Sequence, residues 1–369
     1  MGLPQLTFEL KKAADTVAAR TAQGVIGMIV KDTKSVGVHV IYQESDIPTD
    51  LGADNIAYIK QALTGYINRP TCIYLSVVSS EDGTVSDGFT ALGQYSYDYL
   101  VAPPDITTPD TTTLADLVKE QRKGRYIGKA VLPDTAADHE GIINFTATNI
   151  KVGATTYETG GKYASRIAGI LAGTPADCSA TYAPLPEVTG VDATEDADAA
   201  INSGKLILIN DGRQVKLGRA VTSKTTVADG ETQALKKIKM VAAVDLIRYY
   251  AMTTIEDHYQ GKCSNTYDNK GILLTALRGY LKELENGDVL LEKSSGAELD
   301  AAAIRAFLID QASKAGNVEE ANRIRALDDA AVVKEDTGSY VFIRLFGYVL
   351  DAMEDFAVVL EVSNGLLAV

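Results

Sequence analysis

Strand-like and helix-like patterns of apolar residues alternate through the first 150 residues of the chain. Runs rich in β-branched residues predict strands; they occupy residues 24–32, 36–43, 71–78, 125–133 and 141–152. Between them, apolar residues three and four positions apart predict helices over 55–66, 87–104 and 111–124. Alternating strands and helices are typical of an α/β layered domain, so a largely parallel sheet is expected.

The second half of the chain first shows a short helix and a hairpin. Residues 161–173 predict an apolar helix in which Gly169 and Gly173 leave room for another backbone to approach closely. Residues 204–221 predict a β-hairpin around an Asn-Asp-Gly turn, because these residues tolerate the positive φ of a tight turn. Loops at domain edges are expected over 103–113 and 184–198.

Long helical patterns follow the hairpin. One helix is expected from Ile238 onward, and a row of leucines over 273–284 predicts a second that stops at Gly287. The charged segment 294–327 is also expected to be helical, and residues 340–350 predict a strand.

Both ends of the sequence carry strand-like alternation. The apolar residues on one side of these two runs are Leu6, Phe8, Leu10, Phe356, Val358, Leu360 and Val362. Polar spacers at 11–23 and 351–355 separate the runs from the rest of the chain and are expected to be flexible. We call the two terminal runs the N-terminal arm and the C-terminal arm.

Terminal strands of this kind can pair in two ways, and the residues alone leave both open. An unpaired strand leaves backbone donors and acceptors unmet and offers an edge to another chain. The arms either pair within their own chain or complete a sheet in a neighbouring subunit. Exchange between subunits would produce stacked rings or a helical array, because head-to-tail contacts close only when the rotation between subunits allows it.

Composition restricts the class of protein. The chain has 369 residues, of which 46% are hydrophobic and 23% charged, as in ordinary folded proteins. Its formal charge of -14 repels phosphate backbones and argues against nucleic-acid binding. The three cysteines form no paired motif, so neither a disulfide framework nor a zinc cluster is expected. Glu9 and Asp15 interrupt any secretion signal, and no run reaches membrane-spanning length, so membrane insertion is not expected.

No pattern in the sequence predicts catalysis or metal binding. His39, His139 and His258 are too far apart for a metal-ligand motif. The Gly-Gly-Lys at 160–162 lacks both the spacing and the following Ser or Thr of a phosphate-binding loop. Acidic pairs such as Glu319–Glu320 lie in charged helical segments, where solvated faces normally carry them. We therefore expect no cofactor and no metal, and the missing motifs argue against an enzyme.

Taken in order along most of the chain, these patterns resemble the tail sheath proteins of contractile phages and phage-tail-like bacteriocins, of the short kind found in phages of Gram-positive bacteria. The similar segments are the N-terminal arm with the first strand, the short helix and the segment after it, the hairpin, the two long helices and the last strand. They occupy residues 2–32, 163–191, 200–223, 238–290 and 349–362.

The resemblance implies layered mixed α/β sheets with flanking helices and with terminal strand arms exchanged between subunits. It implies an N-terminal arm and linker over 1–23, an N-terminal α/β domain over 24–158, and a C-terminal α/β domain over 159–350 that faces the inner tube. A second linker and arm would occupy 351–369. The seven apolar arm residues named above would then be the intersubunit strand residues.

The same resemblance implies a structural subunit, not an enzyme, that polymerises as stacked six-fold rings around an inner tail tube and contracts to drive the tube through the target envelope. The implied partners are neighbouring sheath subunits, the tube protein, and the baseplate and tail terminator proteins. The implied location is a virion tail or phage-tail-like particle assembled in the bacterial cytoplasm. A tube-facing helix is expected from the charged residues Glu298, Asp300, Arg305, Lys314 and Arg325; the alternative is an ordinary solvated helix face.

Two other classes remain as alternatives. A soluble α/β enzyme or small-molecule-binding protein would hold its ligand at the carboxyl ends of the strands. Another structural virion component, such as a tube or baseplate protein, would share the assembly logic.

Overall fold

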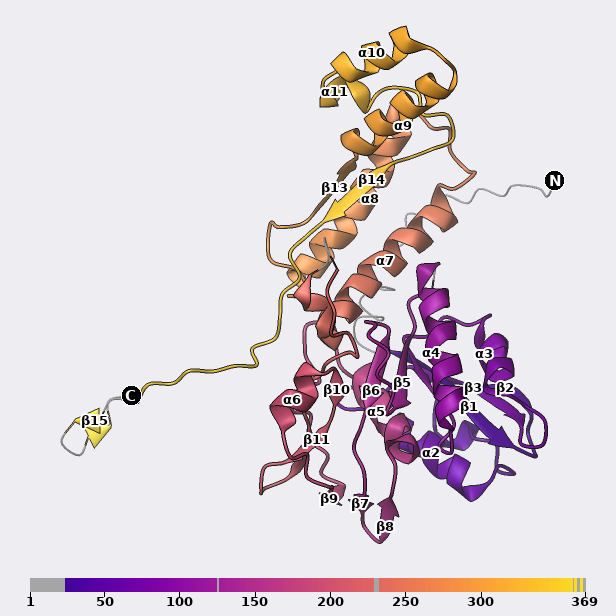
Figure 1. Cartoon of the computed structure of the whole chain (residues 1–369), viewed down its shortest axis with the longest axis vertical. Helices are drawn as coiled ribbons and strands as arrows, with labels where there is room; N and C mark the ends of the chain where they lie inside the picture. The colour runs from indigo at the N-terminus through magenta and orange to yellow at the C-terminus, as the bar shows by residue number, and fades with distance from the viewer. Residues whose placement is uncertain (1–23, 125, 229–231, 361, 364–365, 368–369) are drawn as a thin grey trace.

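A computed structural model of the chain describes residues 24–124, 126–228, 232–360, 362–363 and 366–367. These residues form an α/β body built on one large sheet, and an elongated helical region that extends from it (Figure 1). The predicted α/β class is therefore confirmed.

The large sheet has seven strands in the described residues, in the order β10-β6-β5-β4-β1-β3-β2. Neighbouring strands run parallel except β2, which pairs antiparallel with β3 at one edge. The strands are β1 (Val25–Asp32), β2 (Gly37–Ile41), β3 (Cys72–Ser79), β4 (Tyr99–Val101), β5 (Lys129–Pro133), β6 (Ile142–Phe145) and β10 (Lys205–Leu206). The prediction of a largely parallel sheet is confirmed.

Helices cover both faces of this sheet. They are α2 (Ala53–Leu63), α3 (Val85–Leu92), α4 (Thr108–Lys123) and α5 (Ala164–Ala172). Met28 and Val30 of β1 pack in the core formed with α2 and α5, whereas Ile29 between them packs in the core formed with α3 and α4. Because both faces are buried, the strands carry continuous apolar runs instead of a polar and an apolar side.

The short helix α5 lies unusually close to its neighbours. A Cβ atom placed on Gly169 would lie 2.3 Å from the carbonyl oxygen of Ala62, and one on Gly173 would lie 2.1 Å from that of Asn68. Real Cβ atoms cannot occupy such positions, so glycine is required at both. The predicted close backbone approach is confirmed.

Two predictions for residues 87–113 are wrong. The expected helix over 87–104 ends at Gly93, and Tyr99–Val101 forms strand β4 inside the large sheet. This strand is buried and only three residues long, so it is too short to show a period of two. Residues 103–113 are not simply a loop, because α4 begins at Thr108, where the Thr107 side chain accepts from the backbone amide of Asp110.

Smaller elements complete the α/β body. They are β7 (Ile150–Val152), β8 (Thr155–Tyr157), β9 (Val188–Gly190), β11 (Leu208–Asn210), β12 (Val215–Leu217), α6 (Ala197–Asn202), and the 3-10 helices η1 (Glu44–Asp46), η2 (Gly160–Tyr163) and η3 (Gln233–Lys236). β11 and β12 form the predicted hairpin, with Gly212 at a φ of 84° in its turn. β9 lies within the segment 184–198, where only a loop was expected.

The elongated region contains two long helices, a two-stranded sheet and a terminal helical group (Figure 1). Its elements are α7 (Ile238–His258), α8 (Tyr267–Asn286), β13 (Gly296–Leu299), α9 (Ala301–Lys314), α10 (Val318–Ala326), α11 (Asp329–Val332) and β14 (Ile343–Phe346). Both long helices are confirmed, and α8 ends at Gly287 as predicted. The antiparallel strands β13 and β14 lie beside α8, and α9 to α11 form the end farthest from the α/β body.

The prediction of one helical segment over 294–327 is wrong. Its first part is strand β13, because it pairs with β14 from Gly296 with Phe346 to Leu299 with Ile343. The remainder is divided between α9 and α10 at Gly316, whose φ of 68° ends a helix.

The α/β body extends beyond residue 158, where the N-terminal domain was expected to end. Its larger hydrophobic core continues to Ile238 at the start of α7, and β10 adds to the edge of the large sheet. Separate cores lie farther along, between α7, α8 and β13 and among α9 to α11.

Candidate assembly surfaces

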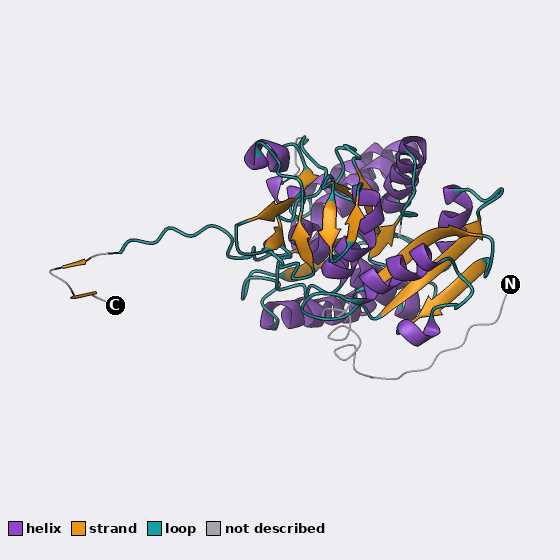
Figure 2. Ribbon diagram, turned by 90° about the horizontal axis from the view of Figure 1, so that it is seen from below, coloured by secondary structure: helices purple, strands orange, loops and turns teal. Residues whose placement is uncertain are grey.

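The C-terminal arm leaves the molecule as an extended, exposed segment (Figures 1 and 2). Phe356 is 75% exposed, Val358 86% and Leu360 67%. Residues 356–360 form no strand with the described part of the chain. Val362 belongs to strand β15 (Val362–Ser363), which pairs with β16 (Leu366–Leu367). The physical reason is that an extended segment needs a neighbouring strand, and residues 356–360 have none among the described residues.

The residues just before the arm are fastened to the α/β body, which the expectation of a flexible spacer over 351–355 did not foresee. The Glu354 carboxylate accepts hydrogen bonds from the Thr181 hydroxyl (2.6 Å), the Ser179 hydroxyl (2.9 Å) and the Lys237 ammonium (2.9 Å). Lys237 also pairs with Asp351 at 2.6 Å, and Arg219 pairs with Asp355. We call these seven residues the arm clasp: Ser179, Thr181, Arg219, Lys237, Asp351, Glu354 and Asp355.

Glu354 is the buried centre of the arm clasp. Its side chain is only 5% exposed, against 43% for Asp351 and 78% for Asp355. Burial alone raises the pKa of Glu354, but the hydrogen bonds from Thr181, Lys237 and Ser179 outweigh burial and leave the pKa below its ordinary value. The carboxylate is therefore ionised at neutral pH and attracts Lys237.

The sheet of β13 and β14 has free edges. Neither strand pairs with a third strand in the described residues. Phe346 on β14 is 43% exposed and Tyr348 just after it is 64% exposed, so apolar surface lies beside an unpaired backbone. An isolated two-stranded sheet is marginally stable, and a further strand would add both main-chain bonds and apolar contacts.

A buried group of charges joins the α/β body to α7. Arg122 of α4 donates two hydrogen bonds to the Asp245 carboxylate, at 2.9 and 3.0 Å, and Lys129 of β5 donates a third at 3.0 Å. The side chains of Arg122, Lys129 and Asp245 are 6%, 2% and 4% exposed. We call these three residues the buried ion triad. Because both cations come from the body and the anion from the helix, the triad holds α7 in a fixed position.

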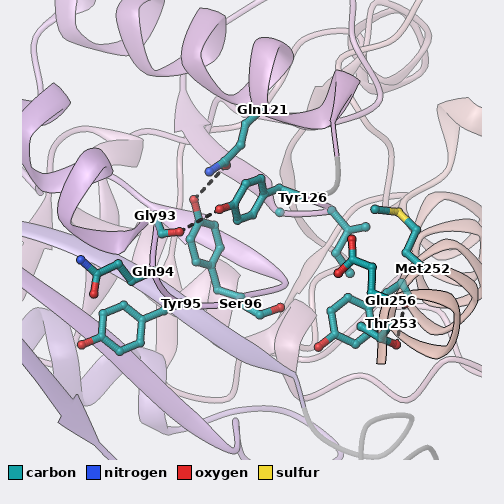
Figure 3. Close-up of a pocket in the computed structure, with 13 residues that line it drawn as sticks. Gly93, Gln94, Tyr95, Ser96, Gln121, Tyr126, Met252, Thr253 and Glu256 are labelled. Carbon is teal, nitrogen blue, oxygen red and sulfur yellow. Dashed lines mark hydrogen bonds between the residues drawn. The ribbon is translucent and has the colours of Figure 1, made fainter. Parts of the chain in front are cut away.

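A cleft of about 310 Å³ lies beside this joint, between the body and the outer part of α7 (Figure 3). The Tyr126 hydroxyl donates to the Gly93 carbonyl at 2.9 Å, and the Tyr97 hydroxyl donates to Gln121 at 3.3 Å. Both tyrosine hydroxyls thus use their hydrogens in bonds within the chain. Met252 and Glu256 of α7 line the opposite side.

Comparison with known proteins identifies the family. A family model of the central domain of phage tail sheath proteins matches residues 80–223. The chain is also 32% identical, over 361 residues, to the tail sheath protein of Clostridium phage phiCD119, and the match covers 96% of this chain and 98% of that relative. The chain belongs to the tail sheath protein family.

Solved structures have the same fold. A sheath tail protein from Listeria innocua matches with a TM-score of 0.67 at 12% identity, covering 92% of this chain and 98% of that protein. The helical sheath of the anti-feeding prophage in its contracted state matches with a TM-score of 0.63 at 12% identity, covering 97% and 98%. As a structural subunit of a contractile tail sheath, the chain is expected to work through its contact surfaces.

The residues predicted for the tube-facing helix of this sheath protein lie on several elements. Glu298 is in β13 and pairs with Arg344 at 2.9 Å, and Asp300 caps α9. Arg305 pairs with Asp329 at 2.9 Å. Lys314 of α9 pairs with Asp310, and Arg325 of α10 donates to Asn322. Each of the five side chains therefore has a partner within the chain, although the Nε atom of Arg305 is buried without one. Glu298 lies beside α8, and the other four lie at the end of the molecule formed by α9 to α11. Leu6, Phe8 and Leu10 of the N-terminal arm lie outside the described residues.

The described residues contain no group of three or more His, Cys, Asp and Glu side chains placed to hold a metal ion. His139 has a pKa lowered mainly by burial, and its Nδ1 accepts from the Gly141 amide at 2.9 Å. The Nε2 of His39 donates to the Ser35 carbonyl at 2.7 Å. No helix among the described residues is long and apolar enough to cross a membrane.

No pattern in the sequence predicts the arm clasp or the buried ion triad. Lys237 and Glu354 are 117 positions apart, and Arg122 and Asp245 are 123 apart, so no local pattern joins them. One signal was available for Asp245, because an acidic residue on the apolar side of a predicted helix usually has a partner.

Proposed function

We propose that this sheath subunit polymerises by strand exchange, with the C-terminal arm of one subunit adding to the β13–β14 sheet of a neighbour. The observation that carries the proposal is the exposure of Phe356, Val358 and Leu360 on an extended segment without a strand partner in the described chain. Main-chain hydrogen bonds would supply affinity, and alternating side chains would supply register.

The magnitude is sufficient for assembly. Burying a large apolar side chain contributes roughly 1.5–3 kcal/mol, so three of them contribute on the order of 5 kcal/mol per contact before ordering costs are subtracted. Leu6, Phe8 and Leu10 of the N-terminal arm, and Val362, are proposed to take part in the same intersubunit sheet. Each contact is modest alone, but a lattice repeats it at every subunit.

Head-to-tail exchange favours stacked rings, for which we propose six-fold symmetry, around an inner tail tube. The lattice would be built in an extended, metastable state. A signal from the baseplate would release it to a shorter, wider state without nucleotide, driving the tube into the target envelope. The tail terminator protein would close the far end, and the particle, a phage tail or a phage-tail-like bacteriocin, would assemble in the bacterial cytoplasm.

We propose that the charged end formed by α9 and α10, with Arg305, Lys314 and Arg325, faces the tube. The support is its position in the fold, at the end of the elongated region (Figure 1). Exposed ion pairs exchange partners at little cost in free energy. The paired charges at this end therefore suit a surface that slides along the tube better than a surface that binds the tube tightly. No catalytic activity and no cofactor are part of this proposal, and neither nucleic acid nor a membrane is a partner.

The organisation we propose has four parts: the N-terminal arm and linker over 1–23, the α/β body, the elongated region, and the C-terminal arm. The support for placing the junction near Ile238, and not at 158, is the extent of the larger core.

Val358→Asp tests the strand exchange. The variant places a charge where a neighbour's sheet would bury an apolar side chain, so we expect a folded monomer that does not polymerise in sedimentation velocity. The matched control is Val36→Asp, at a 57% exposed valine outside both the arm and the β13–β14 sheet, which is expected to polymerise normally. Normal polymers of Val358→Asp would refute exchange through this face of the arm.

A further inference from the structure

We propose that the arm clasp fixes the point from which the C-terminal arm leaves its own subunit, so that the arm bends at Phe356 and reaches one defined neighbour. This inference rests on the strand exchange proposed above. It makes Glu354 a positioning residue for assembly, although Glu354 would touch no other subunit.

The contacts of the segment between β14 and the arm define its path. Leu291 donates its amide to the Tyr348 carbonyl at 2.8 Å, and the Leu350 amide donates to the Val289 carbonyl at 3.0 Å, so this part follows the elongated region. The Leu350 carbonyl then accepts from the Lys239 side chain at 2.8 Å, at the start of α7. The segment therefore reaches the junction between the two parts of the molecule.

From this junction the arm clasp continues onto the α/β body. Lys237 holds Asp351 and Glu354, while Ser179 and Thr181 hold Glu354 from the segment after α5. Arg219, just after β12, holds Asp355. Residues 348–355 are thus fastened to both parts of the molecule, and 356–360 make no backbone hydrogen bond to the described chain.

Burial identifies the member of the clasp that matters most. Asp351 and Asp355 are solvent-exposed, and exposed ion pairs contribute little to stability. Glu354 is enclosed and satisfied by three donors, and Thr181 in turn accepts from the Ala220 amide at 3.0 Å. Removing Glu354 would leave two hydroxyls and Lys237 without their common acceptor, so this end of the segment should detach.

Detachment would change the reach of the arm. Freeing residues 351–355 adds five residues of chain, which extend about 17 Å when fully stretched. A longer free tether lowers the effective concentration of the arm at any one acceptor sheet and gives it access to others. A clasped arm is therefore directed to one acceptor, whereas a released arm is not.

The test compares full-length Glu354→Ala with Asp355→Ala, an exposed member of the same clasp. Hydrogen exchange of peptides covering 348–355 reports on attachment, and the lowest protein concentration that gives polymers reports on assembly. For Glu354→Ala we expect exchange in 348–355 to rise at least about tenfold, with exchange in β1 and β3 unchanged, and the polymerisation threshold to rise about tenfold. Asp355→Ala should stay within about twofold of the wild type on both measurements.

Unchanged exchange in 348–355, or an unchanged threshold despite faster exchange, would overturn the proposal. If Glu354→Ala also raised exchange in β1 and β3, its effect would not be confined to the clasp. The variant Lys237→Met, which keeps the hydrogen bonds from Ser179 and Thr181 to Glu354, is then tested by the same two measurements, and the same outcomes support or overturn the proposal. Deletion of residues 356–369 tests the underlying strand exchange separately. If that deletion polymerised like the wild type, strand exchange by this arm would fail, independently of what Glu354 does.

Discussion

Removing Asp245 should weaken the attachment of α7 to the α/β body. In Asp245→Ala, Arg122 and Lys129 stay buried, at 6% and 2% side-chain exposure, but lose their shared carboxylate. Three charge-assisted hydrogen bonds disappear together, those that Arg122 and Lys129 donate to Asp245 at 2.9 to 3.0 Å. Arg122 would keep its hydrogen bond to the Ile127 carbonyl and its ion pair with Glu140 at 3.7 Å. These contacts would compensate only part of the lost interaction with Asp245.

Breaking a buried ion pair from one side costs about 3–5 kcal/mol, since it leaves an uncompensated charge. We expect Asp245→Ala to lower the free energy of unfolding by this amount, measured from urea unfolding curves. The matched control is Asp351→Ala, which removes an exposed carboxylate and should cost less than about 1 kcal/mol. The triple replacement Arg122→Met, Lys129→Met and Asp245→Leu should recover most of the loss, because an apolar group of similar volume needs no partner.

A loss below about 1 kcal/mol for Asp245→Ala would refute the reasoning. It would mean that water or Glu140 replaces Asp245, and that the triad is not what holds α7. A triple variant less stable than Asp245→Ala would also count against it, because the cost would then come from packing and not from unpaired charge.

Two further predictions concern the arm clasp and α5. Glu354 has a lowered pKa in the folded chain, so its stabilising effect is complete above the ordinary glutamate pKa of about 4.3 and is lost as pH falls through the lowered folded value. The protection of peptides covering 348–355, relative to intrinsic exchange at the same pH, should therefore fall below about pH 4 in the wild type but not in Glu354→Gln, and an equal fall in both would contradict the assignment. Gly169→Ala should destabilise the chain by about 1–3 kcal/mol, because its Cβ would lie 2.3 Å from the Ala62 carbonyl oxygen. The control is Gly271→Ala, whose added Cβ has no atom within 4 Å. Equal free energies of unfolding for the two variants would contradict the close approach at Gly169.

Local pattern was enough to predict most of the elements but not what pairs with them. Strands β1 and β3 are recognisable from their Val- and Ile-rich runs, because both faces of each strand are buried. Helix α8 is recognisable from its row of leucines, because one stripe of the helix is buried. β4 was missed because three residues cannot display a period, and β13 was read as helix because only its pairing with β14 makes it a strand. The role of Glu354 could not be read from its neighbours in sequence, since its donors come from residues 179, 181 and 237.

The C-terminal arm also shows a difference between what the sequence pattern predicts and what one chain forms. Alternation over 356–362 predicts a strand, and in the part of the chain that the structure describes residues 356–360 are extended without a strand partner. A sequence pattern records where a side chain is finally buried, including burial in another subunit, whereas a single chain shows only what it can bury alone. The strand-like pattern and the exposed, extended segment together favour a strand partner in a neighbouring subunit for residues 356–360.

The most direct test of sheath assembly by strand exchange is negative-stain electron microscopy of the purified protein across a concentration series, beside variants lacking residues 1–20 or 356–369. Strand exchange through both arms predicts striated hollow tubes for the full chain and compact monomers for both truncations at every concentration. Tubes that form equally well without either arm would contradict the claim that strand exchange builds the sheath.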